Sequence, residues 1–519
     1  MRGRVSILTS DNLKKKCIGD CIVKHQRQQW MSCGCVGFKL LIASALAFTG
    51  PGLLVAGDKG ARMNKHIEIV LRETQPLTHP RGNRLPLYVW AVLNVHGEDA
   101  EIENMLKALD QRGIAACATW RPGRDRAKTL DQALRIGVIQ KRLGLRVNIN
   151  ANACTYSVFN GSVKTAHIDA DGNAFFDTSS SKQRKLGCPF AVRHRYPAMR
   201  EQIDYYLRAY KEKDIPVDFV FADWEIDGPI EWNEGWSSAK RCVRCCNRIA
   251  KIDDFPTFQK AYRDVRSEIQ RECYAGPVLK HFPKALVGNY GVYPHNGWRY
   301  WYDHFEKPPP KGVPVQTDQR AIYRPWPQEF EACGYTFAMP VVYTRRDIWG
   351  WYDWKNGDFR WFYNLLLQVS SVGKNTSAKT PIISFVNFTS CSKPRSSSDP
   401  IKPMSEKAYT ELLWHMLLRG HDAFFLWCPS ADITRELRPL HKVFSASLEY
   451  REFLDKGVPV TFGIPKRPGP VVSGLRLGKR VLVRRSDFTS AQKPVPLRVG
   501  KILLQVPRAE GQCQILDLL

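Results

Sequence analysis

The sequence predicts an α/β fold, a (β/α)8 TIM barrel followed by a small C-terminal β-sandwich-like domain. Two observations predict the barrel and one predicts the second domain. Between 85 and 429, eight short apolar runs alternate with amphipathic helical stretches, which is the pattern of a parallel sheet wrapped by helices. These runs end in polar or aromatic side chains. Beyond Lys456 the helical period disappears, and short apolar runs separated by turn residues replace it.

The eight β-type runs are recognised by their apolar content and by the turn residues around them. In chain order they are 85–95, 115–120, 146–153, 217–227, 285–293, 337–343, 381–388 and 423–427. Helical stretches are expected at 102–112, 129–143, 197–213, 258–273 and 405–419. A long insertion rich in Gly, Ser and Asp, 167–194, follows the third run. Eight runs in one alternating series predict a closed barrel.

The chain divides into four expected parts: a leader 1–57, a linker 58–84, the barrel 85–450 and a β module 456–519. A length of 519 residues accommodates one large barrel with a small appendage. In the module, Lys and Arg outnumber the acidic residues. Two roles stay open for it, propping the barrel and binding glycan, and we favour the first.

The leader resembles a long secretory signal. An apolar core at 40–48 follows Lys39, and small residues end the stretch near Gly57. Pro51 and Gly52 interrupt it, which argues against a stable membrane span. We therefore expect a secreted protein, or one of the periplasm or cell envelope, with no stable membrane insertion after cleavage. A single N-terminal anchor is the alternative.

The net charge of +27, from 77 basic and 50 acidic residues, predicts an electrostatic preference for polyanions. The sequence contains no zinc-finger spacing, no Gly-rich phosphate loop and no basic helix with heptads. We therefore rank an anionic polysaccharide above a nucleic acid as the partner and expect no nucleic-acid binding. The oligomeric state stays open.

Fifteen cysteines are many for a cytosolic enzyme, and eleven of them follow the expected leader. This odd number leaves at least one thiol unpaired if disulfides form. Cys242, Cys245 and Cys246 form a local cluster, which could hold a metal only if a fourth ligand came from elsewhere. We expect a local disulfide or free thiols there, and we predict neither a metal nor a cofactor.

The fourth run carries the most informative residues of the chain. Asp223, Glu225 and Asp227 follow an apolar segment at every second position, and a period of two places them on one face of the strand. Carboxylates crowded at a buried strand end repel one another and lose hydration, so one of them should hold its proton near neutral pH. That is the property of a general acid; a calcium loop or a solvated loop mouth is the alternative.

Polar and aromatic residues close the other runs as well. Because chemistry in a barrel takes place at the carboxyl ends of the strands, these residues should converge on one pocket. They are Asn94 and His96, Trp120 and Arg121, Asn150 and Asn152, Asp223 and Glu225, Tyr290, Tyr293 and His295, Tyr343, Asn387, and Trp427. Aromatic rings stack on sugars, amides and phenols bond hydroxyls, and carboxylates move protons, so the set predicts a carbohydrate site.

The positions of the acidic residues at the strand ends restrict the possible catalytic mechanisms. A retaining glycosidase commonly adds a nucleophilic carboxylate about 5 Å from the acid. Here the seventh run ends in Asn387 and has no acid. This favours a substrate that supplies its own nucleophile, such as an N-acetyl oxygen. In that scheme Glu225 is the general acid and Asp223 stabilises the charged intermediate, with Asp227 as the alternative stabilising carboxylate.

Several of these motifs resemble the catalytic barrel of the hyaluronidase family of glycoside hydrolases. They are Asp223-Trp224-Glu225, Gly291-Val292-Tyr293-Pro294 with His295, Pro340 to Tyr343, and Trp427. The resemblance implies cleavage of a β-linked N-acetylhexosamine in an acidic glycosaminoglycan by substrate assistance. It also implies that Glu225 donates the proton, that Asp223 orients the acetamido group with Tyr293 and Tyr343 as its contacts, and that Trp427 underlies the reacting sugar. Asp227, Asn387 and the Asn-rich third run depart from that family.

Three functions therefore remain under consideration. The first is a secreted glycoside hydrolase (O-glycosyl hydrolase) acting on an anionic polysaccharide. The second is a non-catalytic glycan-binding envelope protein that uses the same aromatic pocket. The third is a polysaccharide lyase, in which Tyr and His supply the base and the charge neutraliser for β-elimination.

Overall fold

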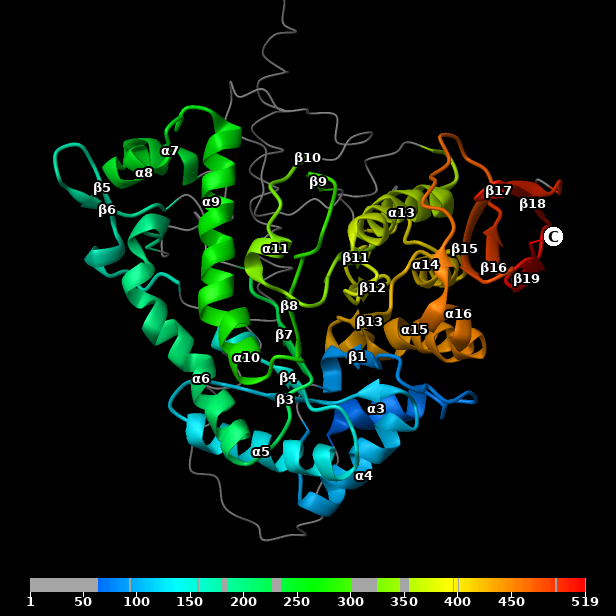
Figure 1. Cartoon of the computed structure of the whole chain (residues 1–519), viewed down its shortest axis with the longest axis horizontal. Coiled ribbons are helices and arrows are strands. Elements are labelled where there is room, and N and C mark those ends of the chain that lie inside the picture. Colours follow the sequence, from blue (N-terminus) through cyan, green and yellow to red (C-terminus); the bar gives the residue numbers. More distant parts are fainter. Residues whose placement is uncertain are drawn as a thin grey trace, which may run out of the picture. The chain divides into compact units, whose positions relative to one another are not determined.

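In a computed structural model, the described part of the chain after residue 85 is built on eight parallel strands that follow one another around a barrel (Figure 1). The structure describes residues 64–92, 95–155, 158–178, 185–225, 235–299, 324–345, 354–394, 396–399, 401–490 and 492–518. The barrel strands are β1 (Leu87–Val89), β2 (Ile114–Ala115) with β3 (Cys117–Thr119), β4 (Asn148–Asn150), β7 (Phe219–Ala222), β8 (Leu286–Asn289), β11 (Val341–Tyr343), β12 (Ile383–Asn387) and β13 (Ala423–Leu426). Each lies within one of the predicted runs or overlaps it.

Backbone hydrogen bonds close these strands into a ring. One sheet has the order β11-β12-β13-β1-β2 and the other β3-β4-β7-β8, with every neighbouring pair parallel. The chain at 114–119 belongs to both sheets, first through β2 and then through β3. On the other side, Met339 exchanges backbone bonds of 3.0 Å with Gly291 and Val292. The predicted (β/α)8 barrel is confirmed.

The helices of the barrel are α4 (Asp99–Asp110), α5 (Arg126–Arg142), α6 (Tyr196–Glu212), α9 (Phe255–Gln270), α10 (Gly276–His281), α11 (Phe330–Cys333), α13 (Gly357–Asn375), α14 (Glu406–Leu417), α15 (Ile433–Ser447) and α16 (Arg451–Lys456). A π-helical turn, Arg271–Ala275, joins α9 to α10. The stretch expected as a linker contains α3 (Lys65–Glu73), whose Ile67 and Val70 are fully buried. Among the described helices, none is long and apolar enough to cross a membrane. The expected leader lies outside the described residues.

Aromatic rings fill the inside of the barrel. In one layer Phe219 stacks on Tyr88, with ring centroids 4.2 Å apart, and on Phe337 at 5.2 Å. In the next layer Phe221 contacts Phe425 at 4.4 Å and Phe385 at 5.9 Å. Rings from strands far apart around the sheet can meet only inside the barrel. Its interior is therefore a dry packed core, as the fold requires.

The C-terminal segment forms two antiparallel sheets. One contains β14 (Val458–Pro459), β15 (Val471–Leu477), β16 (Arg480–Ser486) and β19 (Cys513–Asp517), and the other pairs β17 (Val495–Val499) with β18 (Ile502–Val506). Apolar side chains of both sheets, including Val481 and Val499, pack into one cluster. The expected C-terminal β domain is thus observed.

This domain is joined to α14 by buried polar contacts. His415 bonds the hydroxyls of Ser473 and Ser486 at 2.7 and 2.9 Å, and Arg484 pairs with Glu411 at 2.5 Å. Buried charges and rings of this kind hold two elements in one relative position, because separation would leave them without partners. The expected role of the domain, to support the barrel, stays a prediction.

The variant Gly288→Ala tests how tightly the barrel interior is packed. A methyl group at this position of β8 would lie 2.6 Å from the Phe337 ring. We expect Gly288→Ala to lower the free energy of unfolding by about 1–3 kcal/mol, the usual cost of overpacking a core. Denaturant unfolding measures this change. Gly123→Ala is the matched control, since no atom lies within 4 Å of its added methyl group, and equal stability of the two variants would contradict the account.

Candidate active site

The strand β7 brings Asp223 to the carboxyl end of the barrel. Phe219 and Phe221 point into the barrel, and Asp223 is the next residue on that face of the chain. Trp224 points the other way and is 1% exposed. Asp223 and Glu225 are both partly exposed. Asp227 and Asn94 lie outside the described residues, so their expected roles stay predictions.

Side-chain amides from the neighbouring strands hold the acidic segment. Asn152, after β4, accepts a hydrogen bond of 3.3 Å from the Asp223 backbone N–H. Asn289, at the end of β8, accepts one of 2.8 Å from the Trp224 N–H and donates to the Trp224 carbonyl. The Asn289 amide also donates to Gln270, which accepts a further bond from the Tyr335 hydroxyl. These bonds fix the backbone that carries the two carboxylates.

Loss of hydration is the main influence on the pKa of the Asp223 carboxyl. Its Oδ1 atom is buried, although the residue as a whole keeps a partly exposed edge. Burial disfavours the charged form and raises the pKa of Asp223 from 3.8 to about 7. The raised pKa is that of Asp223, the predicted stabilising partner, whereas the role of Glu225 as proton donor stays a prediction.

Tyr343, Tyr290 and Trp427 form an aromatic wall beside the carboxylates. The Tyr343 ring stacks on Trp427 with centroids 5.9 Å apart, and both tyrosines contact Phe385. Burial raises the pKa of the Tyr343 phenol well above its ordinary value, and the nearby Tyr290, Cys391, Asp223 and Glu225 raise it further. Tyr343 therefore lies close enough to both acids for their charges to raise the pKa of its phenol.

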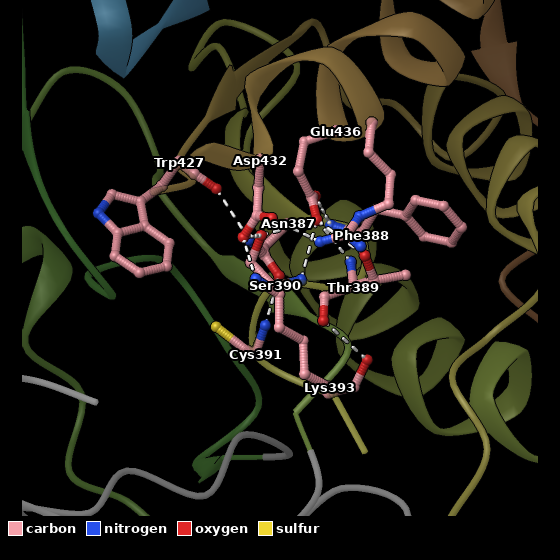
Figure 2. Close-up of polar contacts among 11 residues, drawn as sticks. Asn387, Phe388, Thr389, Ser390, Cys391, Lys393, Trp427, Asp432 and Glu436 are labelled. Carbon is pink, nitrogen blue, oxygen red and sulfur yellow. Dashed lines mark hydrogen bonds and ion pairs between the residues drawn. The ribbon is translucent and has the colours of Figure 1, made fainter. Parts of the chain in front are cut away.

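The end of β12 positions Trp427 through a network of hydrogen bonds (Figure 2). Asn387 donates to the Trp427 carbonyl at 2.9 Å and accepts from the Cys391 N–H at 3.1 Å. Glu436, on α15, accepts bonds from the backbone N–H groups of 388–390. Figure 2 shows the Trp427 indole extending away from this network. Asn387 is fully buried, which corrects its prediction as a substrate contact: it is a positioning residue.

The predicted substrate contacts of two further residues, Asn150 and Trp120, are corrected for the same reason. Asn150 is 7% exposed, and its amide oxygen accepts a bond from the Asn152 N–H. Asn152 is partly exposed next to Asp223 and stays in the candidate site. Trp120 is fully buried and stacks on Tyr206 of α6, with centroids 5.3 Å apart. No face of its ring is left for a sugar, so Trp120 belongs to the packing between strand and helix.

Tyr293 and His295 lie in the chain that follows β8. They are 2% and 5% exposed, and their rings contact each other at 5.8 Å. The His295 ring accepts a hydrogen bond from the Gly297 N–H at 3.1 Å. Gly291, at φ 71°, turns the chain just before them. This burial corrects the expectation that both side chains meet the substrate directly.

A second polar recess lies at the ends of the first two strands. A cavity of about 220 Å³ is lined by His96, Thr119, Arg121 and Gln132 among others. Burial and the charge of Arg121 lower the pKa of His96, which favours the neutral form of its ring.

The side chains able to hold a metal among the described residues are His167, Cys188, Cys242 and Cys245, on the loops after β4 and β7.

Sequence reasoning missed two residues that position the site. Asn289 directly precedes Tyr290 at the end of the fifth run, and its place there is the signal that could have identified it. Glu436 lies on a helix 48 residues from Phe388, and no local pattern connects the two.

No protein-family model and no curated protein matches the chain by sequence. Solved structures similar to it include α-L-fucosidase isoenzyme 2 from Paenibacillus thiaminolyticus, with 10% identity and a TM-score of 0.38 over 71% of this chain. The match spans about half of that protein, 49%. Bee venom hyaluronidase gives 15% identity and a TM-score of 0.29 over 65% of this chain and 96% of its own. A GH36 α-galactosidase from Geobacillus stearothermophilus gives 9% identity and a TM-score of 0.40, and the match covers 87% of this chain and 57% of that protein.

The variant Glu436→Gln tests the hydrogen-bond network that positions Trp427. In Glu436→Gln an amide N–H group would face the N–H groups of 388–390, so we expect a loss of about 1–3 kcal/mol of stability for each donor left without an acceptor. Chemical denaturation measures it. The exposed Glu212→Gln serves as control and should change stability by less than about 0.5 kcal/mol. A loss no larger than that of the control would refute the role of Glu436.

Asp223 gives the fold a pH dependence of defined sign. Between its ordinary pKa of 3.8 and about 7, the folded chain keeps the Asp223 proton while the unfolded chain releases it. Stability therefore falls with rising pH across this window, by on the order of 1.4 kcal/mol for each pKa unit of the shift. We expect Asp223→Asn to match the wild type below pH 4 and to be the more stable protein above pH 7.

Unfolding free energies measured from pH 4 to pH 8 check this expectation. Asp253→Asn, whose side chain is 87% exposed in the wild type, is the control. A difference between Asp223→Asn and the wild type that does not change with pH would show that the Asp223 carboxyl has its ordinary pKa.

Proposed function

We propose that this protein is a glycoside hydrolase that cleaves a polysaccharide, with Glu225 as general acid and Asp223 as its partner. One observation carries the proposal: two carboxylates, one of them with a pKa raised to about 7, adjoin an aromatic wall at the carboxyl end of a closed barrel. Acid-catalysed glycoside cleavage uses two carboxyl groups, one that donates a proton and one that stabilises the charge on the sugar, together with a ring that can stack on that sugar.

Glycoside cleavage needs a proton on the leaving oxygen and a stabilised positive charge on the sugar. In the proposed reaction Glu225 supplies the proton and Trp427 holds the reacting ring, while Tyr343, which is only 6% exposed, supports Trp427 by stacking on it. The strand β7 leads into Asp223 and Glu225, whereas β11, β12 and β13 lead into Tyr343, Asn387 and Trp427. Because Asn387 is buried and bonded to the protein, that strand supplies no nucleophile.

A substrate that provides its own nucleophile fits this arrangement. The acetamido oxygen of an N-acetylhexosamine can attack the anomeric carbon from within the substrate. Asp223, two residues before Glu225 in the chain, then orients the acetamido group and stabilises the charge that develops on it. The net charge of +27 favours an anionic chain as the source of that sugar. We extend the proposal to a secreted or cell-envelope protein, on the strength of the apolar stretch 40–48.

The test is turnover by Glu225→Gln, measured by reducing ends on a panel of acidic and neutral polysaccharides. We expect a loss of about 10²–10⁴ in kcat on the substrate that the wild type cleaves, because general acid catalysis contributes that factor. Binding of the same polysaccharide, measured by calorimetry, should persist. Glu212→Gln, which changes an exposed glutamate on α6, should keep wild-type turnover.

Each other outcome excludes the proposal in a different way. Full activity of Glu225→Gln removes Glu225 as the acid. A wild type that binds polysaccharide and releases no reducing ends is a glycan-binding protein. Products that absorb in the ultraviolet carry a new double bond and identify a lyase.

A further inference from the structure

We propose that His167, Cys188, Cys242 and Cys245 form a structural zinc site. All four side chains are fully buried, and their ligand atoms lie within 4.8 Å of one another. Three thiolates and one imidazole are a common ligand set of four-coordinate structural zinc. The site is separate from Asp223 and Glu225, so the proposal does not depend on the reaction proposed there.

The distances fit a shared metal better than a disulfide. The Sγ atoms of Cys188 and Cys245 are 3.6 Å apart. A disulfide requires about 2.0 Å. Zn–S bonds of about 2.3 Å in a tetrahedron place two sulfurs about 3.8 Å apart. The imidazole Nδ1 of His167 lies 4.0 Å from Cys245 Sγ, on the same scale. All the described cysteines, these included, are free thiols.

The imidazole gives a second, independent indication of a ligand. His167 is fully buried, and the described residues offer its Nε2 atom no hydrogen-bond partner. An unpartnered imidazole nitrogen in a protein interior costs free energy unless something bonds it. The ring is held flat against Phe175, with centroids 5.2 Å apart and planes 21° from parallel. A metal ion among the three sulfurs would bond one nitrogen of this ring, whose Nδ1 lies 4.0 Å from Cys245 Sγ.

The backbone around the cysteines has the form of a metal-binding turn. Helix α7 (Trp236–Arg241) ends directly before Cys242, and α8 (Val243–Arg248) starts directly after it. This turn presents Cys242 and Cys245 at the two-residue spacing that zinc sites use. Cys246 is exposed, and its sulfur contacts the Lys240 carbonyl at 3.4 Å. It therefore points away from the other three thiols.

The surroundings suit an ion with three thiolates. Trp236, Ile249, Phe258 and Tyr262 form a small apolar cluster around the cysteines, separate from the main core. The Tyr262 hydroxyl lies 3.8 Å from Cys245 Sγ, where it can orient that sulfur. Zinc with three thiolates has a net charge of −1. Arg244, bonded to the Ala166 carbonyl at 2.9 Å, and Arg241, over the Phe175 ring, lie on the same segments and offset that charge.

The site would join two long loops of the barrel. His167, in β5 (His167–Ile168), and Cys188 belong to the insertion after β4, whereas Cys242 and Cys245 belong to the segment after β7. These two strands lead into Asn152 and Asp223, the residues bonded to each other in the candidate active site. Zinc would therefore fix the loops that continue from two neighbouring strand ends. Four protein ligands leave no open position, so its role is structural.

The test is the metal content of the full chain, purified under reducing conditions with zinc in the medium. Inductively coupled plasma mass spectrometry should find one zinc per chain. Cys188→Ser and Cys242→Ser should each lower this content at least tenfold. The matched control Cys246→Ser, which changes an adjacent exposed thiol, should keep one zinc.

Cobalt provides a measurement that does not depend on whether a variant folds. Wild-type chain loaded with Co²⁺ should show the strong visible bands and the sulfur-to-cobalt charge-transfer band of a tetrahedral thiolate site. Wild-type chain that takes up neither zinc nor cobalt, or that contains a disulfide among these cysteines by mass spectrometry, would overturn the proposal. Equal zinc loss in Cys246→Ser would overturn the ligand assignment.

Discussion

The aromatic packing inside the barrel is the constraint on which the site depends. Phe219 and Phe221 fill successive layers, and Asp223 is the next inward-facing residue of the same strand. Because the rings below it exclude water, one side of the Asp223 carboxyl is dry and its pKa rises to about 7. The packing that stabilises the barrel thus also produces a carboxyl group that holds a proton near neutral pH.

Amides and one buried carboxylate then fix the chain where the strands end. Asn152 and Asn289 bond the backbone on either side of the acidic segment, while Asn387 and Glu436 hold the turn next to Trp427. Each of these bonds connects a strand end with its neighbour in the ring or with a helix outside it. A strand end has backbone groups without ladder partners, and these side chains satisfy some of them. The proposed zinc would extend the same principle to the loops after β4 and β7.

The sequence predicted the eight strands because each is a short apolar run bounded by turn residues. It did not predict α13, whose residues from Phe359 to Val372 are almost all buried. At the site, a period of two sufficed for Asp223, but it could not separate side chains that face the pocket from those that hold the backbone, such as Asn150 and Asn387. The two-residue cysteine spacing was visible. Its remaining ligands were not, since Cys188 and His167 lie 57 and 78 residues from Cys245.

The most direct test of this account is a crystal structure of Glu225→Gln with an oligosaccharide fragment of the polysaccharide that the protein binds best. The account predicts a sugar ring stacked on Trp427, with its glycosidic oxygen within about 3 Å of the side chain at position 225. It also predicts that Asp223 contacts the substituent next to the anomeric carbon. An oligosaccharide bound elsewhere, with the carboxyl end of the barrel empty, would contradict it.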